Sequence, residues 1–318
     1  MMSDTTARFP LTVEQRERFD RDGYLVVEDL FTDADLQPVI DEIGAEIDAR
    51  ARELVASGAL SRAYEEFGFE HRLARISEET DQVALSIWNG NLAGPALFDL
   101  IRHQKLLDVA EQICGSSELI ASSVYRLRPK IPRYDYGAVP WHQDSGYTEP
   151  FCDRSLMLTV WLPLVDATPE RGCLWVQPGV HRGQVLTHQT RPGKAYLVIP
   201  DEALPPVEPV CVPVKKGGVL LLTNRTPHAS FENTTDVVRW SMDLRYQDAR
   251  LPTNAPITRL PGEVVSTPEN AAPPACYPPE ADFLVRSRLR PNEVVTDPAA
   301  FHRIRTAHLA RPVTRRWE

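Results

Sequence analysis

The 318-residue sequence lacks any apolar run long enough to cross a membrane. Its apolar stretches are short, such as residues 219–222, whereas a membrane span needs about 18 residues. Positive charge is also in deficit, because 35 Lys and Arg stand against 44 Asp and Glu, which gives a net charge of −9. Nucleic-acid sleeves and proteins that bind anionic membranes need a basic surface. We therefore expect neither nucleic acid nor a membrane as a partner.

Regularly spaced cysteines are absent as well. The five cysteines are scattered and form neither a CxxC motif nor a disulfide pattern. Residues 1–10 show no basic-then-apolar pattern of a secretory signal. We expect a cytoplasmic protein with reduced thiols. Its expected state is a monomer or a homodimer.

The remaining composition is that of an ordinary globular chain, with 42% hydrophobic and 25% charged residues. We interpret residues 1–318 as one domain with three parts. Residues 1–118 are predicted to be largely helical, residues 119–247 to form a β core, and residues 248–318 to be a covering segment. Eight prolines between residues 252 and 279 predict ordered coil, a covering loop or a lid.

Local patterns support this division. Thr12 and Gln15 form a capping-box pattern that begins a helix ending near Gly23, and a strand is predicted over residues 24–27. A second helix opens at Thr32, and a third covers residues 96–114 and stops at Gly115. After that the sequence has short strand-like runs separated by Gly and Pro, over residues 119–127, 155–164, 173–176, 196–199, 210–214 and 219–222. The final residues 301–318 are Arg-rich and predicted to be helical. The fold class is mainly β with flanking helices.

Three residues form a candidate metal site. His142 and Asp144 stand two positions apart in a predicted strand, where side chains i and i+2 point to the same face. Alone, such a pair is also typical of a His–Asp hydrogen bond near a turn. His228 follows the predicted strand 219–222, where strand pairing would return it over the first strand; alone, it is more typical of a histidine that caps a turn. Two histidines and one carboxylate suit non-haem Fe(II) and leave coordination positions open.

Residues 237–246 alternate cleanly between polar and apolar side chains. Either the polar face is in water, or it points into a barrel. In the second case Arg239 would be a desolvated guanidinium that needs a carboxylate partner, and a dicarboxylate co-substrate on the iron would supply one.

Taken in order, these segments resemble the phytanoyl-CoA dioxygenase (PhyH) family of Fe(II)/2-oxoglutarate-dependent oxygenases. The resemblance spans roughly residues 11–247 and includes the helix and strand around Gly23, WHQD at 141–144, and Arg239 eleven residues after His228. It also includes GCLWV at 172–176, HASFEN at 228–233, and PGVHRG at 178–183, where Val180 replaces the usual serine.

The resemblance implies a double-stranded β-helix, a cupin-like jelly roll. It implies His142, Asp144 and His228 as the catalytic iron ligands. It further implies that Arg239 pairs with the distal carboxylate of 2-oxoglutarate. Other positions that match co-substrate contacts of the family are Ser230, Lys130, Gln143, Trp161 and Ser241. For Lys130 an exposed loop lysine is the alternative, and for Trp161 core packing is.

The implied reaction consumes O2, converts 2-oxoglutarate to succinate and CO2, and hydroxylates an unactivated C–H bond of a small metabolite or natural product. Relatives that halogenate lack the carboxylate of Asp144, so its presence favours hydroxylation. Desaturation, epimerisation and ring closure begin with the same hydrogen abstraction and stay open. An acyl-CoA 2-hydroxylase of the same family is an alternative. A non-redox metal cupin would not require Arg239, and a metal-free binding module would be expected to have lost one of the three metal ligands.

Overall fold

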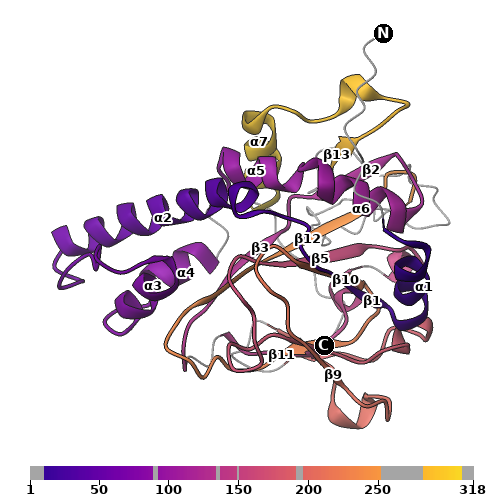
Figure 1. The fold of residues 1–318 in the computed structure, drawn as a ribbon, viewed down its shortest axis with the longest axis horizontal. Coiled ribbons are helices and arrows are strands. Elements are labelled where there is room, and N and C mark those ends of the chain that lie inside the picture. The colour runs from indigo at the N-terminus through magenta and orange to yellow at the C-terminus, as the bar shows by residue number, and fades with distance from the viewer. Residues whose placement is uncertain are drawn as a thin grey trace, which may run out of the picture.

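Helices and two antiparallel sheets make up the part of the chain that the computed structural model describes, residues 11–88, 92–133, 137–148, 150–190, 196–251 and 282–309. Its α-helices are α1 (Val13–Asp22), α2 (Asp33–Ala56), α3 (Phe69–Ser77), α4 (Gln82–Trp88), α5 (Pro95–Ile101), α6 (Gln104–Cys114) and α7 (Pro298–Leu309). In Figure 1, α5 and α6 lie along the strands, and α2 extends away from them with α3 and α4 beneath it.

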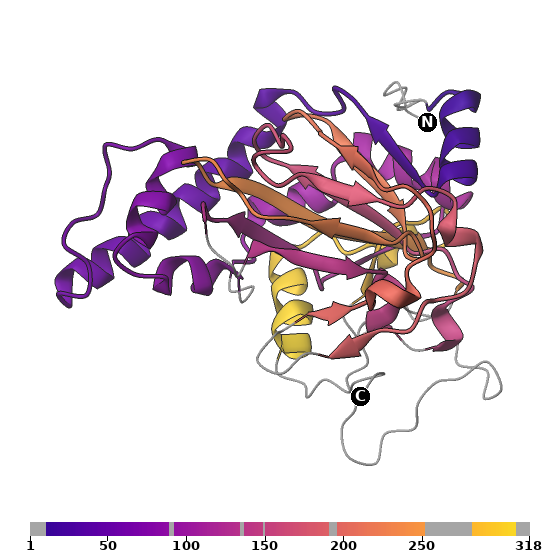
Figure 2. The same ribbon diagram turned by 90° about the horizontal axis from the view of Figure 1, so that it is seen from below.

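The larger sheet has seven strands in the order β1-β10-β5-β12-β2-β13, with β3 also paired to β12. These strands are β1 (Tyr24–Val27), β2 (Leu119–Ser122), β3 (Arg126–Lys130), β5 (Leu158–Pro163), β10 (Val219–Thr223), β12 (Arg239–Asp248) and β13 (Asp282–Arg286). The smaller sheet has the order β4-β11-β6-β9, formed by β4 (Val139–His142), β6 (Leu174–Val176), β9 (Val210–Val212) and β11 (His228–Ser230). A separate pair joins β7 (Gln189–Thr190) to β8 (Leu197–Val198). The two sheets lie over one another, and the helical extension leaves from one end (Figure 2).

The first helix and strand form as the sequence predicts. The Thr12 side chain accepts the amide of Gln15, whose own side chain accepts the amide of Thr12, so the capping box of α1 is present. Gly23 ends α1 in a left-handed conformation, with φ 79°, which glycine adopts without steric cost. The predicted strand over residues 24–27 is β1, an edge strand of the larger sheet.

Several boundaries differ from the prediction. The single helix expected over residues 96–114 is two helices, because the chain turns at Arg102 and His103 between α5 and α6. The helices α3 and α4 were not predicted. They are short, and short helices depend on tertiary packing rather than on propensity. Here Phe69 of α3 stacks on Trp240 of β12, with ring centroids 5.0 Å apart.

The run predicted as one strand over residues 119–127 is also divided, into β2 and β3. Both pair with β12, which is ten residues long. The β3 strand covers the first half of β12, and β2 covers its end. One long strand therefore takes two short partners on the same side, and the chain between them turns at residues 123–125.

The C-terminal part of the chain, predicted as a covering segment, also contributes a strand and a helix to the fold. Strand β13 pairs with β2 and adds an edge to the larger sheet, and α7 packs against α5 and β13. The Pro-rich residues 252–279 and residues 310–318 lie outside the described residues. The division into one domain with three parts stays a prediction. Among the described residues no helix is both long enough and apolar enough to cross a membrane.

Strand β12 separates the interior into two environments. Trp240, Met242 and Leu244 point into the apolar core between the larger sheet and the helices. Arg239, Asp243 and Arg245 lie on the opposite face and line a cavity between the two sheets. Of the two interpretations of residues 237–246, the one that points the polar face into the barrel is therefore confirmed.

Substitution of Gly23 tests the packing at the turn between α1 and β1. A Cβ at this position would lie 2.3 Å from His181 Nδ1 and 2.6 Å from Thr226 Oγ1, in a backbone with positive φ. We expect Gly23→Ala to lower the free energy of unfolding by about 3 kcal/mol, from strain and overpacking together. Urea unfolding measures it. The control is Gly44→Ala in α2, where no atom lies within 4 Å and a gain of about 0.5–1 kcal/mol is expected. Similar values for the two variants would contradict the prediction.

Candidate functional site

Two histidines and one aspartate meet in the cavity. His142 ends β4 and pairs directly with His228, the first residue of β11. Their ring centroids are 4.2 Å apart. Asp144 begins the short 3-10 turn Asp144–Tyr147. All three side chains are buried, and their candidate ligand atoms lie within 4.8 Å of one another. This donor set and its compactness fit a divalent metal ion that keeps open coordination positions.

The route by which Asp144 reaches this position differs from the prediction. His142 and Asp144 were expected on one strand, but β4 ends at His142. Gln143 keeps extended backbone angles, with φ −114° and ψ 141°. Because an extended residue turns successive side chains to opposite faces, Asp144 still returns to the face of His142.

Hydrogen bonds fix the orientation of both imidazoles. His142 Nδ1 lies 2.8 Å from the carbonyl oxygen of Pro140, and His228 Nδ1 lies 3.0 Å from that of Thr226. Since a carbonyl only accepts, each Nδ1 carries the proton and donates it. Each Nε2 is left with a free lone pair for a metal, the arrangement common for metal-binding histidines. Burial, together with the neighbouring His228, lowers the pKa of His142 well below its ordinary value, which favours the neutral form that binds metal.

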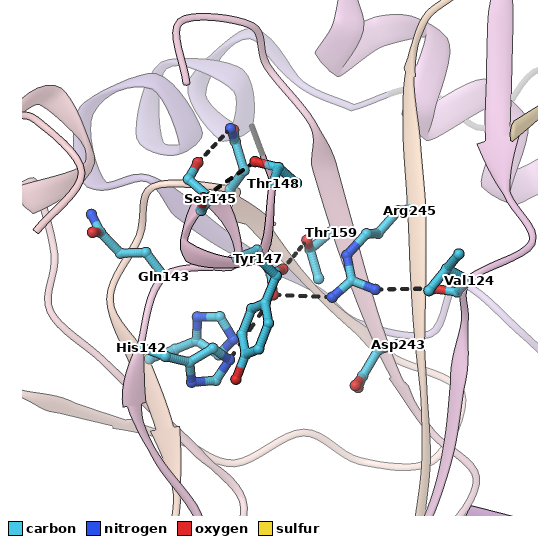
Figure 3. A network of polar contacts seen from close by, with 12 residues as sticks. Val124, His142, Gln143, Ser145, Tyr147, Thr148, Thr159, Asp243 and Arg245 are labelled. Atoms are coloured by element: carbon cyan, nitrogen blue, oxygen red, sulfur yellow. Dashed lines mark hydrogen bonds and ion pairs between the residues drawn. The ribbon is translucent and has the colours of Figure 1, made fainter. Parts of the chain in front are cut away.

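Asp144 is held as a carboxylate by two side chains of the larger sheet, Thr159 and Arg245, which Figure 3 labels. Thr159 of β5 donates its hydroxyl to Oδ2 at 2.5 Å, and Arg245 of β12 donates to Oδ1 at 3.0 Å. Burial acts to raise the pKa of Asp144, but the charge of Arg245, the two histidines and the bond from Thr159 hold it below its ordinary value. The charged form, which is the form that binds metal, is therefore the stable one.

Arg239 lies in the same cavity, and part of its guanidinium group lacks a hydrogen-bond partner. It is 1% exposed. Its guanidinium donates to Ser241 Oγ, and at 3.3 Å to Ser230 Oγ and to the carbonyl of Gly172. Its Nε has no hydrogen-bond partner among the described residues, and no carboxylate in them bonds to it. Burial lowers the pKa of Arg239 to about 10, so the group is charged at neutral pH and lacks a bonded anion.

Of the other predicted co-substrate contacts, three surround Arg239. Ser230 lines the cavity and donates to the carbonyl of Gly172 at 2.9 Å. Ser241 accepts from Arg239. The ring of Trp161 also lines the cavity and has the Arg239 guanidinium 5.2 Å from its centroid. Gly172 is required here, because a Cβ would lie 2.5 Å from the carbonyl oxygen of Phe231.

The other two predicted contacts, Gln143 and Lys130, are not among the side chains that line the cavity. Gln143 is fully buried, but its side-chain amide donates to the carbonyl of Arg225 at 2.6 Å and accepts the amide of Leu186 at 2.7 Å. Figure 3 shows it directed away from His142. Lys130 is 2% exposed rather than an exposed loop lysine. Its amine donates to the carbonyls of Ser230 and Phe231, and burial with Arg239 and Arg128 lowers its pKa to about 6.

Sequence reasoning missed several side chains of the site. Thr159 and Arg245 position Asp144, and an ion pair between Arg128 and Asp243 lines the cavity. The polar face of residues 237–246 already contained Asp243 and Arg245, so the alternation that identified Arg239 carried the signal for both. Thr159 and Arg128 had no comparable signal.

The segment between the candidate ligands His142 and Asp144 is supported by other side chains. His188 Nε2 accepts the amide of Gln143 at 3.0 Å. The Tyr147 ring lies edge-on to His142, with centroids 5.8 Å apart, and its hydroxyl accepts the amide of Leu197 at 2.9 Å. These bonds join the metal-binding segment to the short strand pair β7-β8.

Comparisons with known proteins agree on one protein family. The family model described as phytanoyl-CoA dioxygenase (PhyH) matches residues 19–241. Phytanoyl-CoA dioxygenase domain-containing protein 1 of Bos taurus is 28% identical over 275 residues, with 75% of this chain and 91% of that protein covered. Ectoine dioxygenase of Sphingopyxis alaskensis is 27% identical over 259 residues, with 77% of this chain and 78% of that protein covered.

Solved structures show the same fold. The epimerase SnoN, crystallised with Fe3+, alpha-ketoglutarate and nogalamycin RO, is similar with a TM-score of 0.54 and 20% identity. The comparison covers 86% of this chain and 98% of that one. The predicted jelly-roll core with flanking helices is confirmed.

The buried amine of Lys130 predicts a dependence of stability on pH. Its pKa is about 6 in the folded protein, against an ordinary 10.5 when unfolded. Between these values the unfolded chain binds more protons, so stability rises with pH, by up to about 1.4 kcal/mol per pH unit. We expect this rise to be lost in Lys130→Met, measured by urea unfolding from pH 6.5 to 9. Lys215→Met, which removes an exposed lysine, should keep it. Equal pH slopes for wild type and Lys130→Met would show that this amine is charged when folded.

Proposed function

The chain belongs to the phytanoyl-CoA dioxygenase family of Fe(II)- and 2-oxoglutarate-dependent dioxygenases, and we propose that it hydroxylates an unactivated C–H bond of a small metabolite or natural product. In this proposal His142, Asp144 and His228 hold the iron. Arg239 binds the distal carboxylate of 2-oxoglutarate, supported by Ser230. When bound, Fe(II) and 2-oxoglutarate supply the oxidising power, with O2 consumed and succinate and CO2 released.

The observation that carries the proposal is the buried, incompletely paired guanidinium of Arg239 beside the three metal ligands. An unpaired buried charge is costly. A carboxylate would satisfy it with charge-assisted hydrogen bonds. A non-redox metal cupin or a metal-free module gives no reason to keep this group buried, whereas a dicarboxylate co-substrate does.

Each described side chain has a separate part in this chemistry. The carbonyls of Pro140 and Thr226 hold the two imidazoles with Nε2 toward the metal position. Thr159 and Arg245 keep Asp144 ionised and in place. The apolar side chains of Leu174, Leu222 and Val139 line the same cavity and limit water near the reacting atoms.

The substrate is proposed only as a class. An acyl-CoA, the family's namesake substrate, would need a basic entrance for its phosphates, and Arg286, Arg288 and Arg290 are the candidates in the tail. They pair instead with acidic side chains, Arg286 with Asp108 and Glu111, Arg288 with Glu111, and Arg290 with Glu293. This supports a smaller substrate, with acyl-CoA 2-hydroxylation as the alternative. The cytoplasmic location and the monomeric or homodimeric state stay predictions.

The first test is the visible spectrum of the protein with Fe(II) and 2-oxoglutarate in the absence of oxygen. Chelation of the metal by the keto acid should give a charge-transfer band. In Arg239→Ala the dissociation constant for 2-oxoglutarate, and its KM in turnover, should rise about 10- to 100-fold, because a charged hydrogen bond contributes about 1.5–3 kcal/mol. The control is Arg62→Gln, an exposed arginine. A missing band in the iron-loaded wild type would favour the metal cupin, and an unchanged constant in Arg239→Ala would move the carboxylate site elsewhere.

The metal ligands are tested by His228→Ala. Loss of one of three protein ligands should abolish turnover and lower the iron retained after dialysis, measured by elemental analysis together with succinate release. His302→Ala removes an exposed histidine of α7 and should retain both. Turnover dependent on 2-oxoglutarate in His228→Ala would exclude this triad as the iron site.

A further inference from the structure

The inner face of the larger sheet carries more positive charge than the proposed iron and co-substrate explain. Antiparallel partners place their side chains on the same face. Arg126 of β3 is paired with Asp243, and Arg128 with Ser241. Both arginines therefore lie on the same face of the sheet as Arg239 and Arg245 of β12; of these four, Arg128, Arg239 and Arg245 line the cavity. The carboxylates that line this cavity are Asp144 and Asp243.

Each of the two carboxylates is already bonded to an arginine. Arg245 donates to Asp144 at 3.0 Å. Arg128 donates through Nε to Asp243. Arg239 is accounted for by the distal carboxylate of 2-oxoglutarate in the proposed function. Arg126 is left with no hydrogen bond and no ion pair to the described residues, and Asp243 acts on it only through its charge.

The surroundings of Arg126 make this isolation costly. The side chain is half-buried, and burial together with Arg128, Arg245 and Arg305 lowers its pKa to about 10. It is therefore charged at neutral pH among like charges. Iron would add further positive charge nearby. An oxyanion with room to bind would relieve both the lost hydration and the repulsion.

Arg126 is too far from Arg239 to share one carboxylate with it. Asp243, its partner in the register, lies four residues along β12 from Arg239, which corresponds to about 13 Å of extended strand. Arg126 lies instead near the end of β12 where Arg245 contacts Asp144. The positive charge of Arg126 thus stands near Arg245 and Asp243, away from the position proposed for the distal carboxylate of 2-oxoglutarate.

Aromatic side chains lie beside Arg128 and beside His142. The Arg128 guanidinium is 5.2 Å from the ring centroid of Trp88, and Trp88 meets Tyr196 edge-on at 6.4 Å. The Tyr147 ring stands against His142, and Figure 3 shows the two side chains next to one another. These rings offer apolar surface to a carbon skeleton between the arginines and the metal ligands.

We propose that Arg126, assisted by Arg128, binds an oxyanion group of the substrate, so that the substrate is an organic acid whose carbon skeleton lies between this group and the metal. The oxyanion is a carboxylate or a phosphate monoester. The proposal rests on the proposed function, since it takes the iron and 2-oxoglutarate sites as given. Bidentate recognition of planar carboxylates and of phosphates is characteristic of arginine.

The test measures binding of paired probes to the oxygen-free protein loaded with Fe(II) and saturating 2-oxoglutarate. Hexanoate and phenylacetate are each compared with their primary amides, and hexyl phosphate with hexanol, by the shift that each causes in the charge-transfer band. In the wild type the acid should bind at least about tenfold more tightly than its neutral partner, the factor expected for one charged hydrogen bond. Preference for the carboxylate pairs or for the phosphate pair identifies which oxyanion the subsite takes.

The decisive variant is Arg126→Gln, which keeps length and polarity and removes the charge. Its acid-to-neutral ratio should fall to about one, Arg126→Lys should retain part of the preference, and the control Arg62→Gln should keep all of it. Neutral partners that bind as tightly as the acids, acids that give no shift, or a preference that survives in Arg126→Gln would each overturn the proposal.

The same spectra separate this proposal from the proposed function. A wild type that shows no charge-transfer band with Fe(II) and 2-oxoglutarate contradicts the oxygenase assignment itself. A band of normal intensity without acid preference contradicts only the role of Arg126. The band in Arg126→Gln also reports whether that variant retains its iron site.

Discussion

The register of β12 in the larger sheet determines which side chains face the metal site. Alternate residues of a strand point to opposite faces, so a slip of one residue would exchange all of them. Trp240 and Tyr246 fix the register on the helical side, where their polar atoms donate to the carbonyls of Phe69 at 3.2 Å and Ile101 at 2.7 Å. Arg239, Asp243 and Arg245 consequently face the cavity.

Strand β12 links the larger sheet to the candidate metal site, whose histidines come from the smaller sheet. The two histidines come from the smaller sheet, where β4 and β11 pair directly, but the aspartate between them depends on the larger one. Thr159 and Arg245, which hold Asp144, are themselves paired residues of β5 and β12. The carboxylate is therefore oriented by the same register that brings Arg239 into the cavity, and the proposed iron and co-substrate positions are linked by one strand.

The sequence predicted those features of the structure that follow from local rules. The capping box at Thr12, the turn at Gly23 and the alternation around Arg239 each express a local rule, and each appears in the structure. The break of the third predicted helix at Arg102 and the division of residues 119–127 depend on which neighbours the segments meet, and a sequence pattern does not contain that information. The same holds for Gln143 and Lys130, because the local sequence does not specify which backbone groups surround a buried amide or amine.

The structure also indicates that stability is given up at the site in favour of binding. A core made only for stability would neither bury the Nε of Arg239 without a partner nor place Arg126 among like charges, since each costs free energy in the absence of an anion. Such groups are retained where a ligand completes them. Because a ligand that binds only the folded state adds its binding free energy to stability, the ligand-free protein carries a deficit that 2-oxoglutarate and an acidic substrate would offset. With these two positions taken together, the arrangement favours two anionic ligands, one at Arg239 and one at Arg126, and disfavours neutral molecules of the same shape.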